Sequence, residues 1–182
     1  MHEELIRELS VITEEEQHIL DGRKEIDPQL YTEKKDMVID SKKLLQKGKL
    51  IQVRPHTRFV HFPKHTHNYI EVIYMCQGRT THIINGTEVI LEAGDLLFLN
   101  QNAVQEILPA GRDDIAVNFI VLPEFLDTAF SMMGDEENQL RDFLVGALSG
   151  RDGETCWMYF HVADILPVQN LIENMVWTIF YD

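Results

Sequence analysis

The chain of 182 residues is 45% hydrophobic and carries a formal net charge of −14, which allows one domain with a substantial core. Residues 51–182 hold 18 acidic and 7 basic residues, and no lysine follows Lys64, so the basic face that nucleic-acid binding requires is not encoded here. No apolar run approaches the ~20 residues of a membrane span, and the start MHEELIREL is unlike a signal peptide, so we expect a cytoplasmic protein without a membrane partner.

Residues 1–48 are predicted to form an N-terminal helical extension. Thr13 is followed three places later by Glu16, a capping-box pattern that begins a helix. A second helix is expected from about Glu33 to Gln46, since apolar residues recur there and a glycine follows. Packing against the main domain or against a partner is the expected role of both helices.

Residues 49–122 change to short segments that are rich in β-branched and aromatic residues. The expected strands are KLIQVR, RFVHF, YIEVIYMC, THIIN, EVIL, DLLFL, VQEIL and IAVNFIVL. Asn85–Gly86 predicts a type I′ hairpin, because both residue types tolerate left-handed backbone angles. Many short strands with few helices between them indicate an antiparallel sandwich or barrel, and not βαβ units.

Residues 123–182 are predicted to contain helices and one returning strand, CWMYFHV. Pro123 suits a first helical turn, and Gly150 suits the end of a second helix. In the last helix, apolar residues step by four, three and four, which fits either core packing or a dimerisation seam. These residues are Val168, Ile172, Met175 and Ile179. The helix reaches the last residue without a stop signal, so we expect a longer protein.

Four residues whose side chains can bind a metal ion or a polar ligand occupy alternate positions of the segment HTHNYIE: His65, His67, Tyr69 and Glu71. A regular strand would place all four side chains on one face, because strand side chains alternate with a period of two. Two imidazoles and a carboxylate can bind iron, zinc, nickel or manganese and leave positions open. The same groups can instead contact a polar ligand, or form a structural cluster that is satisfied by its own hydrogen bonds.

The pattern His65-x-His67-x₃-Glu71-x₆-Gly78 matches the first motif of the cupin family, which the chain resembles. The second motif of that family runs from a glycine through a proline and a glycine to a histidine, the fourth ligand. The corresponding residues here are Gly94, Asn100, Asn102 and Gln105, so only the first of these four is kept. An amide oxygen binds zinc or iron more weakly than an imidazole, which favours a sensor over an enzyme.

From about Lys49 to Pro123 the chain is similar to the amino-terminal effector domain of AraC-family transcription regulators. RPHTRFVHFPKHTHNYIEVIYMCQGRTTHIINGTEVILEAGDLLFLNQNAVQEI and DDIAVNFIVLPEF carry this resemblance. It implies a mainly β fold, a cupin-type antiparallel β-barrel (double-stranded β-helix) with flanking α-helices at both ends. It also implies a small effector, often a sugar, a homodimer, and DNA binding by a separate basic domain, expected after residue 182.

The chain is therefore predicted to be the ligand-sensing and dimerisation domain of an AraC-like regulator, with a small sugar-like metabolite as its effector. We expect no catalytic residue and no cofactor. The predicted ligand-binding residues are His65, His67, Tyr69, Glu71, Gln105 and Arg58. The alternative is a metal-dependent cupin enzyme, a dioxygenase or isomerase, in which His65, His67 and Glu71, with Gln105, would bind the divalent metal.

Overall fold

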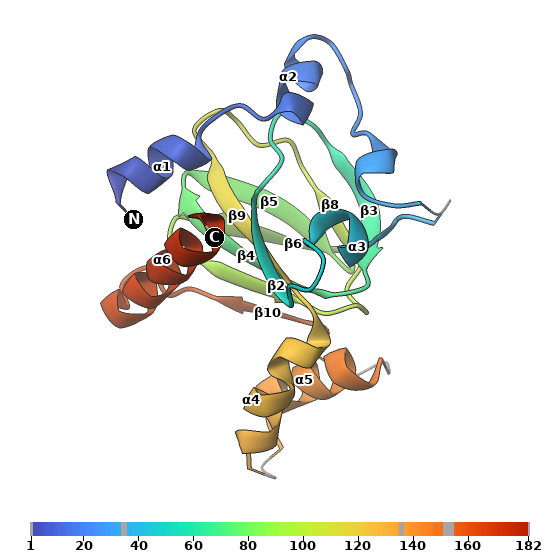
Figure 1. Ribbon diagram of the computed structural model, residues 1–182, viewed down its shortest axis with the longest axis vertical. Coiled ribbons are helices and arrows are strands. Elements are labelled where there is room, and N and C mark those ends of the chain that lie inside the picture. Colours follow the sequence, from blue (N-terminus) through green and yellow to red (C-terminus); the bar gives the residue numbers. More distant parts are fainter. Residues whose placement is uncertain (1, 34–35, 135–136, 151–154, 182) are drawn as a thin grey trace.

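The computed structural model describes residues 2–33, 36–134, 137–150 and 155–181, and its centre consists of β-sheets with helices at both ends (Figure 1). One sheet has the strand order β1 (Val38–Ile39), β3 (Phe62–His67), β8 (Gln105–Ile107), β5 (Arg79–Ile84) and β6 (Thr87–Glu92). The other has the order β10 (Trp157–Phe160), β7 (Leu96–Leu99), β4 (Ile70–Gln77), β9 (Ile115–Val121) and β2 (Ile51–Pro55). The mainly β prediction is confirmed, but the described strands form two separate sheets and no closed barrel.

The two sheets pack against each other through apolar side chains that strand alternation directs inward. Ile84 and Leu91 from one sheet and Ile73 and Leu97 from the other belong to the same core cluster, and all four are fully buried. Except for β1, which pairs in parallel with β3, the paired strands are antiparallel. This arrangement leaves polar side chains of β3, β4 and β9 around an internal space.

Asn85 and Gly86 connect β5 to β6, as the sequence predicts. Their φ angles are 50° and 85°, so both residues have the left-handed conformation that a type I′ turn requires. The turn pairs Ile84 directly with Thr87.

The N-terminal segment contains α1 (Glu3–Leu9), α2 (Glu14–Leu20), the 3₁₀ helix η1 (Pro28–Leu30), β1 and α3 (Ser41–Leu44). The capping box at Thr13 is confirmed. The predicted helix from Glu33 to Gln46 is wrong: β1 occupies its middle, α3 spans four residues, and residues 34–35 lie outside the described part. Tertiary pairing overrides the helical pattern, because Ile39 pairs with His67 of β3.

The predicted strand RFVHF is also wrong over most of its length. Phe59 has a φ of 69°, which a β-strand cannot accommodate, and β3 begins only at Phe62.

After β9 the chain forms η2 (Pro123–Leu126), α4 (Asp127–Met132) and α5 (Gln139–Ser149), which project from one end of the sheets (Figure 1). The last helix, α6 (Leu166–Tyr181), lies near α1 and packs against the core (Figure 1). The apolar residues that step along α6 are partly buried against that core, as the core-packing alternative predicts. They are Val168, Ile172, Met175 and Ile179. Within the described ranges, no helix combines the length and apolar character needed to cross a membrane.

Candidate functional site

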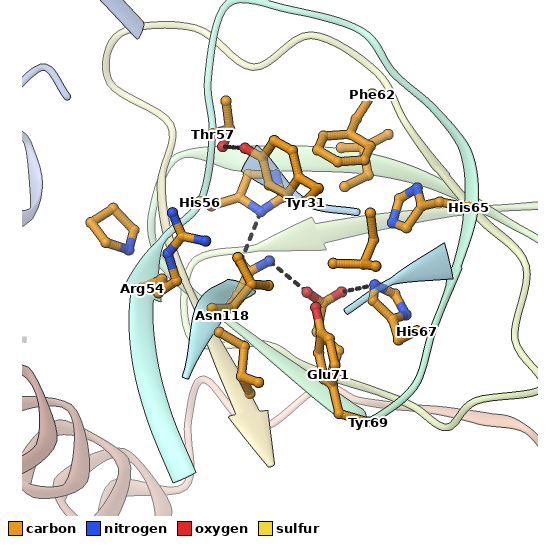
Figure 2. A pocket seen from close by; sticks show the side chains of 15 residues that line it. Tyr31, Arg54, His56, Thr57, Phe62, His65, His67, Tyr69, Glu71 and Asn118 are labelled. Atoms are coloured by element: carbon orange, nitrogen blue, oxygen red, sulfur yellow. Dashed lines mark hydrogen bonds and ion pairs between the residues drawn. The ribbon is translucent and has the colours of Figure 1, made fainter. Parts of the chain in front are cut away.

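The alternating residues of the HTHNYIE segment surround one internal cavity of about 50 Å³ (Figure 2). His65 and His67 lie on β3, Glu71 lies on β4, and Tyr69 is in the connection between these strands. Each of the four is at most 4% exposed. The structure thus brings them together, although two strands and a tight connection replace the single regular strand that the sequence suggested.

The cavity walls come from both sheets and from the N-terminal segment. Tyr31, Ile39 and Leu44 contribute to the lining, so the N-terminal segment forms part of the wall. The remaining lining residues are Arg54, Pro55, His56, Thr57, Phe62, His65, His67, Tyr69, Glu71, Ile107, Asn118 and Ile120. Apolar walls with a few convergent polar groups are typical of small-molecule sites.

A chain of polar contacts crosses the cavity floor from His56 to His67 (Figure 2). Nδ1 of His56 lies 2.9 Å from Oδ1 of Asn118, and Nδ2 of Asn118 donates to Oε1 of Glu71 at 2.8 Å. Nε2 of His67 lies 3.4 Å from Oε2 of Glu71, a contact that lacks hydrogen-bond geometry. His56, Asn118 and Glu71 are far apart in sequence, and the pairing of β2 with β9 and of β9 with β4 brings them together.

Three polar atoms of this chain are buried and have no hydrogen-bond partner among the described residues: Nε2 of His56, Nδ1 of His67 and Oε2 of Glu71. Buried polar groups in native proteins are nearly always satisfied by protein, water or ligand. All three residues line the same cavity. The residues that carry these atoms therefore line the cavity with hydrogen-bonding capacity that the described residues leave unmet.

Burial sets the protonation states of the site. Desolvation raises the pKa of Glu71 from 4.5 to about 7, and the hydrogen bond from Asn118 opposes that shift. Desolvation lowers the pKa of His65 to about 4, and desolvation together with the neighbouring His65 lowers the pKa of His67 well below 6.5. Both imidazoles are consequently neutral at physiological pH, while Glu71 is poised near its titration point.

Gln105, a predicted ligand-binding residue, supports His65 from behind and does not line the cavity. Its amide lies 3.1 Å from Nε2 of His65 and 3.0 Å from Nδ1 of His82, and Thr80 lies 2.9 Å from the other nitrogen of His82. The carbonyl oxygen of Pro63, 2.7 Å away, accepts from Nδ1 of His65. The hydrogen bond from Nδ1 to Pro63 and the packing of Nε2 against Gln105 fix the orientation of the His65 ring.

Arg58, the other predicted contact, lies outside the cavity in a buried ion pair. Its Nε donates to Oε1 of Glu16 at 2.7 Å, and its side chain is 3% exposed. Further hydrogen bonds go to the carbonyl oxygens of Ser10, Val11 and Arg112. Arg58 therefore attaches α2 and the α1–α2 connection to the sheets.

The histidines and the glutamate do not fit a divalent metal ion. Nδ1 of His65 donates to the carbonyl oxygen of Pro63, and its Nε2 lies 3.1 Å from Oε1 of Gln105, outside the cavity lining. A metal site needs several donor atoms that converge on one point. In the part of the chain that the structure describes, no group of three or more His, Cys, Asp or Glu side chains is arranged to hold a metal.

The cavity residues that the sequence analysis did not predict include Tyr31, Arg54, His56 and Asn118. Asn118 carried a usable signal, because it is the single polar residue in the apolar strand IAVNFIV. A polar group in a buried strand needs a partner, which points to a site. The other three lie in segments whose pattern contains no comparable irregularity.

The part of the chain that contains most of the cavity residues is similar to known proteins. Residues 51–131 match the family model described as AraC-like ligand binding domain. No curated protein matches the chain. Similar solved structures include unsaturated fatty acid-bound ToxT from Vibrio cholerae strain SCE256, with 11% identity, a TM-score of 0.46, and coverage of 68% of this chain and 45% of ToxT.

An apo ToxT variant from the same strain has 12% identity, a TM-score of 0.49, and coverage of 71% of this chain and 49% of its own. The DMSP lyase DddQ from Ruegeria pomeroyi DSS-3 has 18% identity, a TM-score of 0.33, and coverage of 47% of this chain and 38% of the lyase. The chain spans about half the length of the ToxT structures that it matches.

Proposed function

Because residues 51–131 are an AraC-like ligand-binding domain of cupin type, we propose that this chain is the effector-binding part of a transcription regulator. Its effector is a small, sugar-like metabolite that binds in the internal cavity. His65, His67, Tyr69 and Glu71 line the binding site, while Gln105 and Arg58 support it from outside.

The observation that carries this proposal is the set of unpartnered buried atoms on His56, His67 and Glu71. Leaving a buried donor or acceptor unsatisfied costs roughly 1–3 kcal/mol per group. A hydroxylated ligand would supply all three partners at once, and the aromatic ring of Tyr69 and the side chains of Ile107 and Ile120 would contact its apolar parts.

The small volume of the cavity implies that the protein changes conformation when the effector binds. About 50 Å³ holds roughly three to five water molecules, since one needs about 10–15 Å³. A sugar therefore needs more room than this, and we propose that movement of Tyr31, Ile39 and Leu44 in the N-terminal part of the wall provides it. Ligand binding then favours one arrangement of the N-terminal segment over another, and this difference in affinity is what shifts the population.

We further propose that the regulator is a cytoplasmic homodimer and that a separate basic domain binds DNA. The 18 acidic and 7 basic residues of 51–182 support the separation, since an acidic surface repels phosphates. Sedimentation analysis of the chain tests the dimer: a mass of twice 21.2 kDa is expected, and a monomer at micromolar concentration would contradict it.

The competing function, metal-dependent catalysis, would require His65, His67 and Glu71 to converge on one ion, which they do not do in the described structure. Elemental analysis of the purified protein separates the two functions. The sensor needs no bound metal, whereas the enzyme needs near-stoichiometric iron, zinc, nickel or manganese that is lost in His67→Ala.

A thermal-unfolding screen with monosaccharides tests effector binding. A ligand that binds only the folded state raises Tm, by RT ln(1 + [L]/Kd) in free energy. We expect at least one sugar to raise the Tm of the wild type and of His61→Ala, but not of His67→Ala. His61 is the matched control, because its side chain is 47% exposed and bonds Glu106 outside the cavity. An equal rise of Tm in both variants would show that the sugar binds outside the cavity and would contradict the proposal.

A further inference from the structure

The polar chain across the cavity floor has a direction that the amide of Asn118 sets. Nδ2 of Asn118 donates to Glu71, so Oδ1 of the same amide faces Nδ1 of His56 at 2.9 Å. An amide oxygen only accepts, and Nδ1 of His56 must therefore carry the hydrogen. The imidazole of His56 is fully buried, and this desolvation lowers its pKa, which keeps the ring neutral.

A neutral imidazole with its hydrogen on Nδ1 presents a bare lone pair on Nε2. That atom is buried, has no partner among the described residues, and belongs to a residue that lines the cavity. A lone pair accepts a hydrogen bond from O–H or N–H. It repels the oxygen of an ether or a carboxylate, so the site selects for a donor at this position.

The charges of the cavity walls narrow the choice of donor. Arg54 and Glu71 both line the cavity, and they have opposite charges when Glu71 is ionised. A ligand of either charge would be attracted by one of these side chains and repelled by the other, so the two walls together favour neither sign. Burying an unpaired charge costs far more than burying a hydroxyl that forms hydrogen bonds. A neutral ligand meets both walls without that cost.

We propose that His56 determines effector specificity by accepting a hydrogen bond at Nε2 from a hydroxyl of a neutral polyol. Asn118 and Glu71 are positioning residues, since they hold the ring and fix its tautomer. This inference rests on the proposed function, which places the effector in the cavity but does not say which residue determines effector specificity.

The tautomer can be measured in the ligand-free protein. Long-range ¹H–¹⁵N spectra of the ¹⁵N-histidine-labelled chain at pH 7 distinguish protonated from bare ring nitrogens, and His56→Phe assigns the signal. We expect a bare Nε2 and a protonated Nδ1. A hydrogen on Nε2 of His56 would overturn the inference without any effect on effector binding as such.

Ligand selectivity is the second test. Calorimetric or NMR titrations compare two matched sets of neutral, anionic and cationic compounds: glycerol, glycerate and serinol, then glucose, gluconate and glucosamine. We expect the neutral member to bind at least tenfold tighter than its charged counterparts. Tighter binding of a charged member that depends on His67 would preserve the proposed function and overturn this inference. No binding by any member would overturn the polyol assignment.

Substitution locates the effect. His56→Phe keeps a flat ring and removes the acceptor, so affinity for the neutral ligand should fall at least tenfold while His61→Phe keeps wild-type affinity. Melting curves check that each variant is folded. His56→Gln serves as the second variant, because it is polar at this site and is expected to bind with intermediate affinity. Unchanged affinity in both variants would overturn the role of His56.

Discussion

Nδ2 of Asn118 donates a hydrogen bond of 2.8 Å to Oε1 of Glu71, a carboxyl that is 4% exposed. This contact places a polar side chain of β9 against a polar side chain of β4 beneath the cavity. The other oxygen of Glu71 has only the 3.4 Å contact with His67. The buried carboxyl of Glu71 therefore has a hydrogen bond on only one of its two oxygens, so its burial should affect the pH dependence of folding.

Glu71→Gln should change the pH dependence of folding. The folded-state pKa of Glu71 is about 7, above its ordinary 4.5, so its stabilisation is complete below pH 4.5 and is lost as the pH rises through 7. The wild type should lose roughly 3 kcal/mol relative to the glutamine variant between pH 4.5 and 8. Urea denaturation across that range measures the difference, and a pH-independent difference would contradict the assignment.

His65→Gln should reduce the sensitivity of folding to acid. The folded-state pKa of His65 is about 4, below the ordinary 6.5, so its stabilisation is present above pH 6.5 and is lost as the pH falls towards 4. The slope of unfolding free energy against pH in that window should decrease by up to roughly 1.4 kcal/mol per pH unit. Denaturation curves at four pH values give the slope; equal slopes for variant and wild type would show that His65 does not titrate as described.

The buried pair of Arg58 and Glu16 should contribute far more than a surface pair. Arg58→Gln leaves Glu16 with an uncompensated buried charge and should cost roughly 3–5 kcal/mol. Arg23→Gln is the matched control, because Arg23 pairs with Asp27 at 3.3 Å and is 43% exposed. Its loss should cost less than about 1 kcal/mol. Chemical denaturation compares them, and hydrogen exchange should show faster opening of α2 only in Arg58→Gln. Equal costs would contradict the anchoring role.

The strands and turns of this protein could be predicted because local chemistry determines them. Asn85–Gly86 can adopt two successive positive φ angles more readily than other pairs, and β4 and β9 are mostly apolar because most of their residues are buried. The position of His65, His67 and Glu71 around one space also followed from strand alternation, even though the turn at Tyr69 interrupts the strand.

The remaining features depend on contacts that are distant in sequence. Ile39 is apolar in a helical pattern but pairs with His67, so the environment and not the pattern decides its conformation. Arg58 has the chemistry of a ligand contact, yet Glu16, 42 positions away, binds it. His56 contacts Asn118, 62 positions away, because the pairing of β2 with β9 brings Asn118 beside it. No local rule links these residues.

Gly78 of the first motif should tolerate alanine less well than Gly86. Both have positive φ, 76° and 85°, and that conformation costs alanine about 1 kcal/mol at either site. A Cβ at Gly78 would also meet Oδ1 of Asp114, whereas one at Gly86 meets nothing within 4 Å. Asp114 cannot move freely, because it accepts from the backbone of Arg79 and Gly111.

We therefore expect Gly78→Ala to cost roughly 1–3 kcal/mol more than Gly86→Ala. Paired urea denaturation measures the difference. Similar costs at the two glycines would show that Asp114 yields without penalty.

The central claim is that the internal cavity is the effector site. Calorimetric titration of the best sugar from the thermal screen into wild type and His67→Ala tests it most directly. The account predicts saturable one-site heats for the wild type and at least a tenfold weaker affinity for a His67→Ala protein that melts as a folded domain. Identical heats for the two proteins would contradict the claim, because the ligand would then bind elsewhere.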